Sequence, residues 1–326
     1  YSDMTIRRKT GAANRKVQKL MNLMNMETVH VAWDFLKENG LKALILKSKH
    51  KIQGIDDDYD YAEWWNLTKP SEEELEEQKK KKFDYMPKFS IVIPVYKTPE
   101  KFLKEMLDSI VEQTYANWEL CIADGSPAGE SVENVLKKYA EKDARIRYQV
   151  LGENRGISGN TNAALEMAEG DFIVLADHDD RLTPNALFEC AKKLNENENC
   201  DVLYSDEDKL DMDGDELFDP HFKPDFNPDL LTSVNYICHL FVVSHDLAAR
   251  TGGFRQEFDG AQDYDFIFRC VESAGQVYHI PKVLYHWRCH QNSTASNPES
   301  KLYAFEAGSR AIMAHYDRVG IQAERV

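Results

Sequence analysis

FSIVIPVYKTPEKFLKEMLDSIVEQ, residues 89–113, is the stretch that decides the fold. Its apolar run at 90–95 is typical of a strand that is covered on both faces, and a helical stretch follows at 100–113. The same alternation continues along the chain, with strands expected at 118–123, 147–151, 171–176, 201–205 and 277–280 and helices at 131–139, 158–168, 184–195 and 263–274. This order predicts an α/β fold with a mostly parallel, doubly wound sheet, whose ligand sites lie at the carboxyl ends of the strands.

The region before this stretch differs in composition. Residues 12–51 show helical spacing, and Ser71 with Glu74 forms a capping box at the start of a charged helix that leads to Pro87. We therefore expect two regions, a helical and basic N-terminal region with a linker at 1–87 and the α/β domain at 88–326.

The charge is divided unevenly along the 326 residues. The whole chain has a net charge of −16, whereas residues 1–55 hold 11 Lys or Arg and only four acids. The acidic balance excludes a uniformly basic nucleic-acid binder, because contacts to phosphates need clustered Lys and Arg. The six cysteines form no C-x-x-C pair and no apolar run approaches the roughly 20 residues that cross a bilayer, so we expect a cytoplasmic protein with reduced thiols.

Carboxylates follow two of the predicted strands. ELCIAD ends at Asp124, and DFIVLA runs into Asp177, His178, Asp179 and Asp180. The Asp-x-Asp pair of Asp177 and Asp179 offers hard oxygen ligands that suit Mg²⁺ or Mn²⁺. For Asp180 we expect a structural role as the cap of the next helix.

The glycine-rich segment GENRGISGN, residues 152–160, matches neither a dinucleotide fingerprint nor a P-loop. A glycine-rich turn into a helix still offers backbone N–H groups to a phosphate or ribose. DKLDMDGDE, residues 208–216, does not fit the frame of a calcium-binding loop, and we interpret it as a hairpin with its tip at Asp213–Gly214.

Two later motifs carry residues that suit catalysis. In GAQDYDFIFR, Asp263 lies where a loop meets a helix, so an N-cap role would explain it without any function. LYHWRCH places His286 and His290 four residues apart.

Taken together and in order, FSIVIPVY, ADGS, NRGISGNTN, ADHDD, QDYDF and LYHWR resemble the inverting family 2 glycosyltransferases, which have the GT-A fold. The resemblance covers about residues 88–315. The segments YSDEDK, FKPDFNPDLL and NYICH are most similar to enzymes of bacterial cell-surface polysaccharide synthesis, of the O-antigen and rhamnan type.

The resemblance implies a role for each matching residue. Asp263 corresponds to the general base, and Asp177 and Asp179 to the aspartates of the ribose and metal site. His286 best corresponds to the histidine that completes the metal site, with His290 as the alternative. The nucleotide-sugar site is implied at Pro94, Tyr96, Asp124, Asn154, Gly156, Asn160 and Asp177, and Asp124 favours a uridine or thymidine base.

The implied function is metal-dependent transfer of a sugar from a UDP- or dTDP-sugar to a glycan or lipid-linked acceptor, with Mn²⁺ or Mg²⁺. The alternative is a catalytically silent GT-A module that holds glycan or recruits another enzyme. The basic residues 1–55 have two interpretations, namely docking on anionic lipid at the inner face of the membrane, or a helical appendage that packs on the domain or forms a homodimer.

Overall fold

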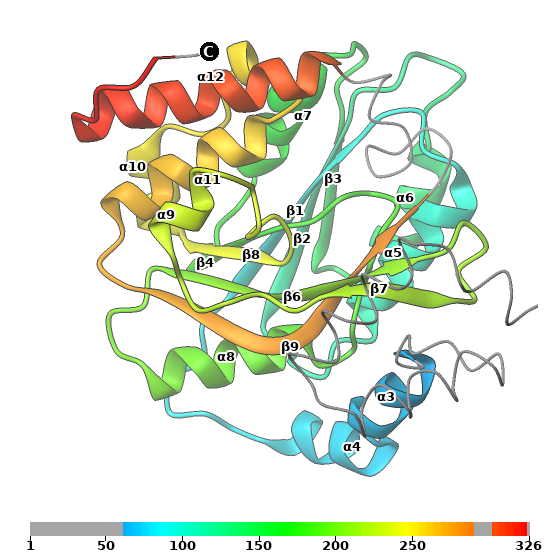
Figure 1. Ribbon diagram of the computed structural model, residues 1–326. Helices are drawn as coiled ribbons and strands as arrows, with labels where there is room; N and C mark the ends of the chain where they lie inside the picture. Colours follow the sequence, from blue (N-terminus) through cyan, green and yellow to red (C-terminus); the bar gives the residue numbers. More distant parts are fainter. Residues whose placement is uncertain (1–60, 290–301, 325–326) are drawn as a thin grey trace, which may run out of the picture. The chain divides into compact units, whose positions relative to one another are not determined.

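The computed structural model describes residues 61–289 and 302–324 (Figure 1). In chain order, its elements are α3 (Tyr61–Thr68), α4 (Glu72–Lys80), β1 (Phe89–Val95), α5 (Glu100–Val111), β2 (Trp118–Asp124), α6 (Glu133–Ala140), β3 (Ile146–Val150), α7 (Gly156–Leu165), β4 (Phe172–Leu175) and β5 (Arg181–Leu182). They continue with α8 (Ala186–Glu196), β6 (Val202–Leu210), β7 (Leu217–His221), α9 (Pro228–Leu231), β8 (Phe241–Ser244), α10 (His245–Thr251), the 3-10 turn η1 (Gln256–Phe258), α11 (Gln262–Ser273), β9 (Val277–Arg288) and α12 (Leu302–Val319).

The strands form one sheet in the order β3-β2-β1-β4-β8-β6-β9-β5, with β7 paired to β6. The half built from β3, β2, β1 and β4 is parallel, as the alternation of strands and helices predicts. The other half is mixed, because β8 runs antiparallel to both β4 and β6, while β6 and β9 pair in parallel. Since parallel strands end at the same edge, β1, β2 and β4 bring their following loops to one side of the molecule.

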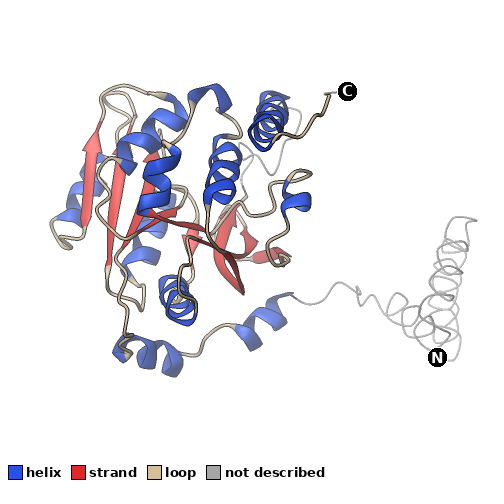
Figure 2. Cartoon of the chain, turned by 90° about the vertical axis from the view of Figure 1, so that its left-hand side faces the viewer, coloured by secondary structure: helices blue, strands red, loops and turns tan. Residues whose placement is uncertain are grey.

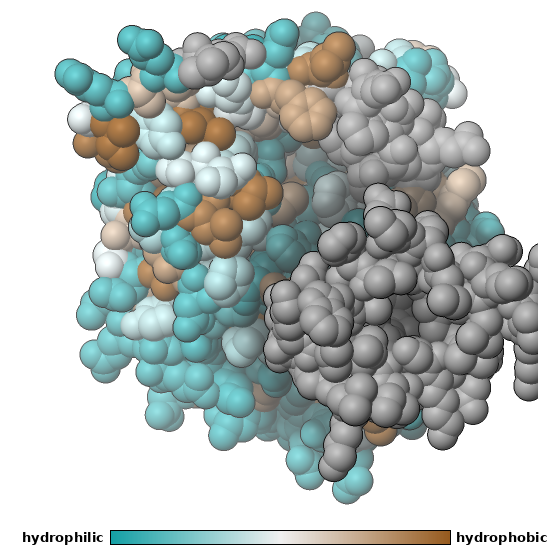
Figure 3. All heavy atoms as spheres, viewed as in Figure 1, coloured by the Kyte–Doolittle hydropathy of each residue, from teal (hydrophilic) through white to brown (hydrophobic). Residues whose placement is uncertain are grey.

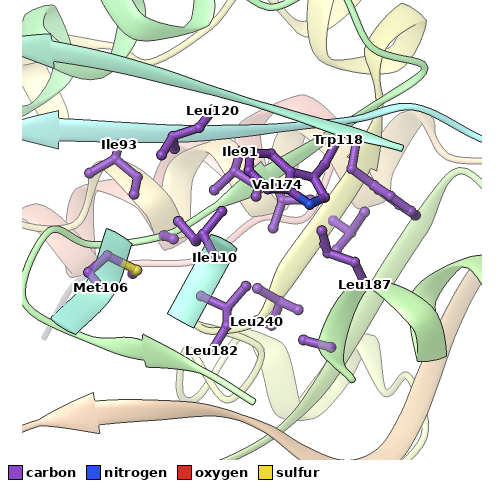
Figure 4. Close-up of a cluster of buried hydrophobic side chains, with 14 of the residues drawn as sticks. Ile91, Ile93, Met106, Ile110, Trp118, Leu120, Val174, Leu182, Leu187 and Leu240 are labelled. Carbon is purple, nitrogen blue, oxygen red and sulfur yellow. The ribbon is translucent and has the colours of Figure 1, made fainter. Parts of the chain in front are cut away.

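Helices cover both faces of the sheet (Figure 2). Strand β1 shows why, because Ile91 and Ile93 belong to the buried cluster under α5, α6 and α8, whereas Val92 belongs to the cluster under α7, α10 and α11. Successive side chains of a strand point to opposite faces, so an apolar strand supplies two cores. Figure 4 shows the first of these cores, in which Ile110 of α5 and Leu187 of α8 lie among the strand residues.

Helices α3 and α4 precede the sheet and belong to the same compact unit. The predicted capping box is confirmed, since Ser71 accepts from the Glu74 N–H and Glu74 accepts from the Ser71 N–H. Side chains join this segment to the sheet domain, with Thr114 Oγ1 donating to Gln78 Oε1 at 2.9 Å. The division into 1–87 and 88–326 stays a prediction, and residues 1–55 lie outside the described residues.

Two local expectations have different outcomes. The hairpin tip at Asp213–Gly214 is confirmed, since it joins β6 to β7 and Gly214 has a φ of +85°. The capping role of Asp180 is wrong, because α8 begins at Ala186 with Asn185 at its N-cap, and Asp180 is fully buried. Within the described residues, no helix is both long and apolar enough to span a membrane.

Candidate active site

A cavity of about 1100 Å³ opens beside the carboxyl ends of β1 and β4. Three residues predicted for the site line it, namely Pro94, Asp177 and Asp263. Its far walls come from β6 and β7 and from α12. Val234 and Phe305 line it with 50% and 65% of their surfaces exposed, and Figure 3 shows apolar surface gathered on the side of the molecule where α9 and α12 lie. The cavity therefore has polar walls at the strand ends and apolar ones toward these helices.

Asp177 and His239 face each other at this cavity, with 3.5 Å between Oδ2 and Nε2. Among the described residues, these two and Asp180 form a group of three His, Cys, Asp or Glu side chains whose ligand atoms all lie within 4.8 Å of one another. Neighbouring ligands on an octahedral ion with bonds of about 2.1 Å lie about 3 Å apart, so Asp177 and His239 are close to the spacing of a shared cation. Two carboxylates and an imidazole suit Mn²⁺ better than Mg²⁺, which prefers oxygen alone.

Asp180 lies behind this pair and is engaged by the chain itself. Its Oδ2 accepts from Tyr285 Oη at 2.5 Å and its Oδ1 from the Arg288 N–H at 2.7 Å. Tyr285 Oη also lies 3.0 Å from the Asp177 backbone nitrogen, which donates to it, and the Tyr285 ring stacks on His239 at 4.7 Å. Tyr285 thus fixes three members of the cluster relative to one another.

The titratable groups of the cluster are shifted in different directions. Burial, together with the charges of Asp179 and Asp177, raises the pKa of Asp180 well above its usual range. Burial also raises the pKa of Asp177, but the His239 imidazolium outweighs it and the net shift is downward. For His239, burial lowers the pKa, whereas Cys238 and the Asp177 carboxylate reverse the shift and raise it well above the ordinary value. Without a metal, the Asp177–His239 contact is therefore an ion pair.

Asp263 is the second residue of α11 and lines the same cavity, where its Oδ2 lies 3.9 Å from the Sγ of Cys238, the residue before His239. It is not the N-cap, which is Ala261, so capping does not explain its position. Asn235 Nδ2 donates to Asp263 Oδ2 at 2.8 Å and orients the carboxylate. Burial raises the pKa of Asp263, which makes the carboxylate a stronger base than an exposed aspartate.

The residues predicted for the nucleotide lie around the ends of β1 and β2. Asp124 is fully buried, and its carboxylate accepts from Ser131 Oγ at 2.6 Å and from the Ser126 N–H at 2.9 Å. Tyr96 is 40% exposed just after β1. The assignment of these two residues to the base stays a prediction.

The glycine-rich turn leads into α7, as expected, and its amides already have partners. Asn154 Oδ1 accepts from the Gly156 N–H at 3.0 Å and from Asn160 Nδ2 at 3.1 Å. Asp259 Oδ1 accepts from Ser158 Oγ at 2.5 Å, so a carboxylate of the chain occupies the position beside the helix N-terminus. Gly156 has a φ of +76°, and a Cβ there would lie 2.8 Å from Asp259 Oδ2. The turn is therefore closed by its own side chains.

The predicted histidine differs from the one found in the cluster. His286 lies on β9 between Tyr285 and Trp287, and since strand neighbours alternate, it points away from the face that contacts His239. Its Nδ1 lies 2.5 Å from Asp208 Oδ1 instead. His286 and Asp179, the other predicted metal ligands, do not belong to the three-residue cluster. His290 lies outside the described residues.

The sequence motifs predict no role for His239 or Asn235. Both belong to the segment NYICH, which carries part of the family resemblance, and this position just before an apolar strand was the available signal. The segment between α9 and β8 has no regular periodicity, so nothing in the sequence showed which of its side chains turns inward.

Residues 90–249 match the model of glycosyl transferase family 2. This stretch is a glycosyl transferase family 2 domain. The chain is 35% identical to the O-antigen biosynthesis protein RfbC of Myxococcus xanthus over 81% of this chain and 21% of that protein. The chain spans about a quarter or less of the length of the first curated relatives it matches.

Two solved structures resemble the glycosyltransferase domain. S. aureus TarS in complex with UDP-GlcNAc has a TM-score of 0.57 at 22% identity, over 73% of this chain and 68% of that chain. A mannosyltransferase from Pyrobaculum calidifontis, in complex with GDP-Man and Mn²⁺, has a TM-score of 0.50 at 18% identity, over 77% of this chain and 71% of that chain. At these identities the likeness concerns the fold alone, and the GT-A fold implied by the sequence motifs is confirmed.

Proposed function

We propose that this domain is a metal-dependent inverting glycosyltransferase that moves a sugar from a UDP- or dTDP-sugar to a glycan or lipid-linked acceptor in bacterial surface polysaccharide synthesis. The observation that carries the proposal is one cavity that holds both a polar cluster suited to a cation, at Asp177 and His239, and a separate, part-buried carboxylate, Asp263. Inverting transfer needs these two kinds of group on opposite sides of the reacting sugar carbon.

Asp263 takes the role of general base. Its carboxylate accepts the proton of the acceptor hydroxyl while that oxygen attacks the anomeric carbon, and the bond to the nucleoside diphosphate breaks on the far side of the sugar. Asn235 keeps Asp263 Oδ2 in place through its 2.8 Å hydrogen bond. A bound divalent cation supplies charge stabilisation for the departing diphosphate. Asp177 and His239 would hold that cation, and Asp179 stays the further candidate ligand from the sequence.

The donor and acceptor classes rest on the relatives. TarS is described with UDP-GlcNAc, the mannosyltransferase with GDP-Man and Mn²⁺, and RfbC as an O-antigen biosynthesis protein. The predicted role of Asp124 toward a pyrimidine base and the UDP-GlcNAc complex of TarS favour a uridine or thymidine diphosphate sugar, whereas the GDP-Man complex concerns a purine nucleotide. The description of RfbC favours a surface-glycan acceptor.

The test is hydrolysis of UDP- and dTDP-sugars, in which water replaces the unidentified acceptor. We expect Mn²⁺-dependent release of the nucleoside diphosphate that is abolished in Asp177→Ala and in Asp179→Ala. Asp246→Ala is the matched control, because this aspartate lies on the exposed first turn of α10. Nucleotide binding without turnover would favour the silent module, and no nucleotide binding would exclude the transferase.

For the basic residues 1–55 we propose docking on anionic lipid, with each Lys or Arg near the surface contributing about 1 kcal/mol. Sedimentation with liposomes that contain or lack anionic lipid, for the full chain and for a chain without residues 1–55, tests this. Binding that ignores lipid charge would contradict it, and a concentration-dependent dimer that needs residues 1–55 would favour the alternative.

A further inference from the structure

Lys223 is a fully buried lysine that the reaction itself does not use. Its side chain is 0% exposed, and its Nζ donates to Glu207 Oε2 at 3.2 Å and to the carbonyl oxygen of Ile237 at 2.7 Å. It also donates to the carbonyl oxygen of His239. A buried ammonium group is costly unless each of its three protons has an acceptor, and here each one does.

Glu207 also binds the backbone of His239. Its Oε2 accepts from the His239 N–H at 3.3 Å, so the amide and the carbonyl of His239 are bound by the two members of one buried ion pair. Glu207 is itself buried, with 7% of its side chain exposed. Its other oxygen lies 3.4 Å from His221 Nδ1 at the cavity wall.

The segment that these two residues hold is strained and carries two parts of the site. Cys238 has a φ of +35°, a region that few residues other than glycine adopt. The Cys238 N–H donates to Asn235 Oδ1 at 3.4 Å, and Asn235 in turn orients Asp263. A tight turn of this kind persists only where the surroundings fix it, so residues 235–239 depend on an external support.

We propose that the buried Glu207–Lys223 pair is a clamp on the turn 235–239, and that it positions His239 against Asp177 for cation binding. This inference rests on the proposed function, because it takes His239 as a cation ligand. Glu207 and Lys223 are positioning residues, since they act on the backbone of His239 and not on the substrate. Lys223 is itself anchored, because Asp206 Oδ1 accepts from its backbone N–H at 2.8 Å.

The clamp is tested with Glu207→Gln/Lys223→Met. Removing both charges avoids leaving one of them buried and unpaired, which is the main route by which Lys223→Met alone would unfold the domain. Glu189→Gln/Lys282→Met is the matched control, because this pair joins a lysine to the buried carboxylate of Glu189 at 2.7 Å, away from the cavity, and loses both charges in the same way.

Two readouts apply to the folded proteins. In hydrogen exchange, we expect peptides covering 235–240 to exchange about tenfold faster in Glu207→Gln/Lys223→Met than in wild type, and to be unchanged in Glu189→Gln/Lys282→Met. In Mn²⁺ titration followed by electron paramagnetic resonance, we expect Glu207→Gln/Lys223→Met to bind about tenfold more weakly, as for other residues that orient a metal ligand. In a His239→Ala background the same two substitutions should weaken binding no further, because the clamp acts through His239.

The outcomes separate the clamp from the proposed function. Unchanged exchange and Mn²⁺ affinity in a folded Glu207→Gln/Lys223→Met variant would overturn the clamp alone, as would an undiminished tenfold loss in the His239→Ala background. A wild-type protein that binds no Mn²⁺ would overturn the metal-dependent function, and the positioning role would fall with it.

Discussion

Replacing Asp263 by Asn removes the proposed base with the smallest change of shape. One carboxylate oxygen becomes an amide group, and the remaining oxygen can still accept from Asn235 Nδ2, which now lies 2.8 Å away. The remaining oxygen can also accept from the N–H groups of Asp263 and Tyr264 in the first turn of α11, which the carboxylate contacts. The substitution therefore tests proton acceptance and little else.

The expected loss is large. A positioned general base contributes roughly 10²- to 10⁴-fold, which corresponds to about 2.7 to 5.4 kcal/mol of activation free energy. The stability of the folded protein, unlike kcat, should not fall. Burial raises the pKa of Asp263, so the folded state holds its proton more tightly than the unfolded chain, and the stabilisation of the protonated form is lost as pH rises through that pKa. At neutral pH the uncharged amide introduced by Asp263→Asn is thus expected to leave the melting temperature equal or higher.

The assay measures kcat for nucleoside diphosphate release with saturating donor and Mn²⁺, beside thermal unfolding by circular dichroism. Asp246→Asn is the control, because this side chain is 84% exposed in the first turn of the neighbouring α10. A kcat for Asp263→Asn within about threefold of wild type, in a folded protein, would refute the assignment of Asp263 as base.

Three further predictions follow from the same contacts. In the pH profile of kcat/KM, the apparent pKa of the acid limb should lie above the range of an exposed aspartate, since burial raises the pKa of Asp263 and activity needs its carboxylate. An apparent pKa in the ordinary range of aspartate would contradict this. His239→Ala should weaken activation by Mn²⁺ by about tenfold or more while UDP binding without metal stays constant, and an unchanged activation constant would remove His239 from the cation site. Leu103→Ala should lower the free energy of unfolding by about 2–5 kcal/mol in urea titration, because Leu103 is fully buried between α5 and the sheet, and a loss below about 1 kcal/mol would show that this core is loosely packed.

The part of the fold that local pattern determines was predictable. Strand β1 and helix α5 lie at Phe89–Val95 and Glu100–Val111, close to the predicted 90–95 and 100–113, because apolar runs and helical spacing are properties of adjacent residues. The antiparallel strand β8 was not predicted, and β7 was expected only as the second strand of the hairpin at Asp213–Gly214. Their pairing depends on β4 and β6, and such partners leave no local periodicity in the strands themselves.

The site residues likewise divide into those that a local motif indicates and those that distant contacts place. Asp177 and Asp263 could be found because each lies beside an expected element in a recognisable motif. Asp180 was misjudged as a helix cap, since its burial comes from Tyr285 and Arg288, more than 100 positions later in the chain. His239 was passed over for a similar reason. Its inward position is set by Lys223 and Glu207, which bind its backbone and leave no mark on the sequence around it.

The most direct test of the account is calorimetric titration of the chain with UDP and dTDP in the presence and absence of Mn²⁺. We predict saturable binding of at least one of these nucleotides that is strengthened by Mn²⁺ in wild type and not in Asp177→Asn. Binding of neither nucleotide, or nucleotide binding that is equally strong with and without Mn²⁺ in both proteins, would contradict it.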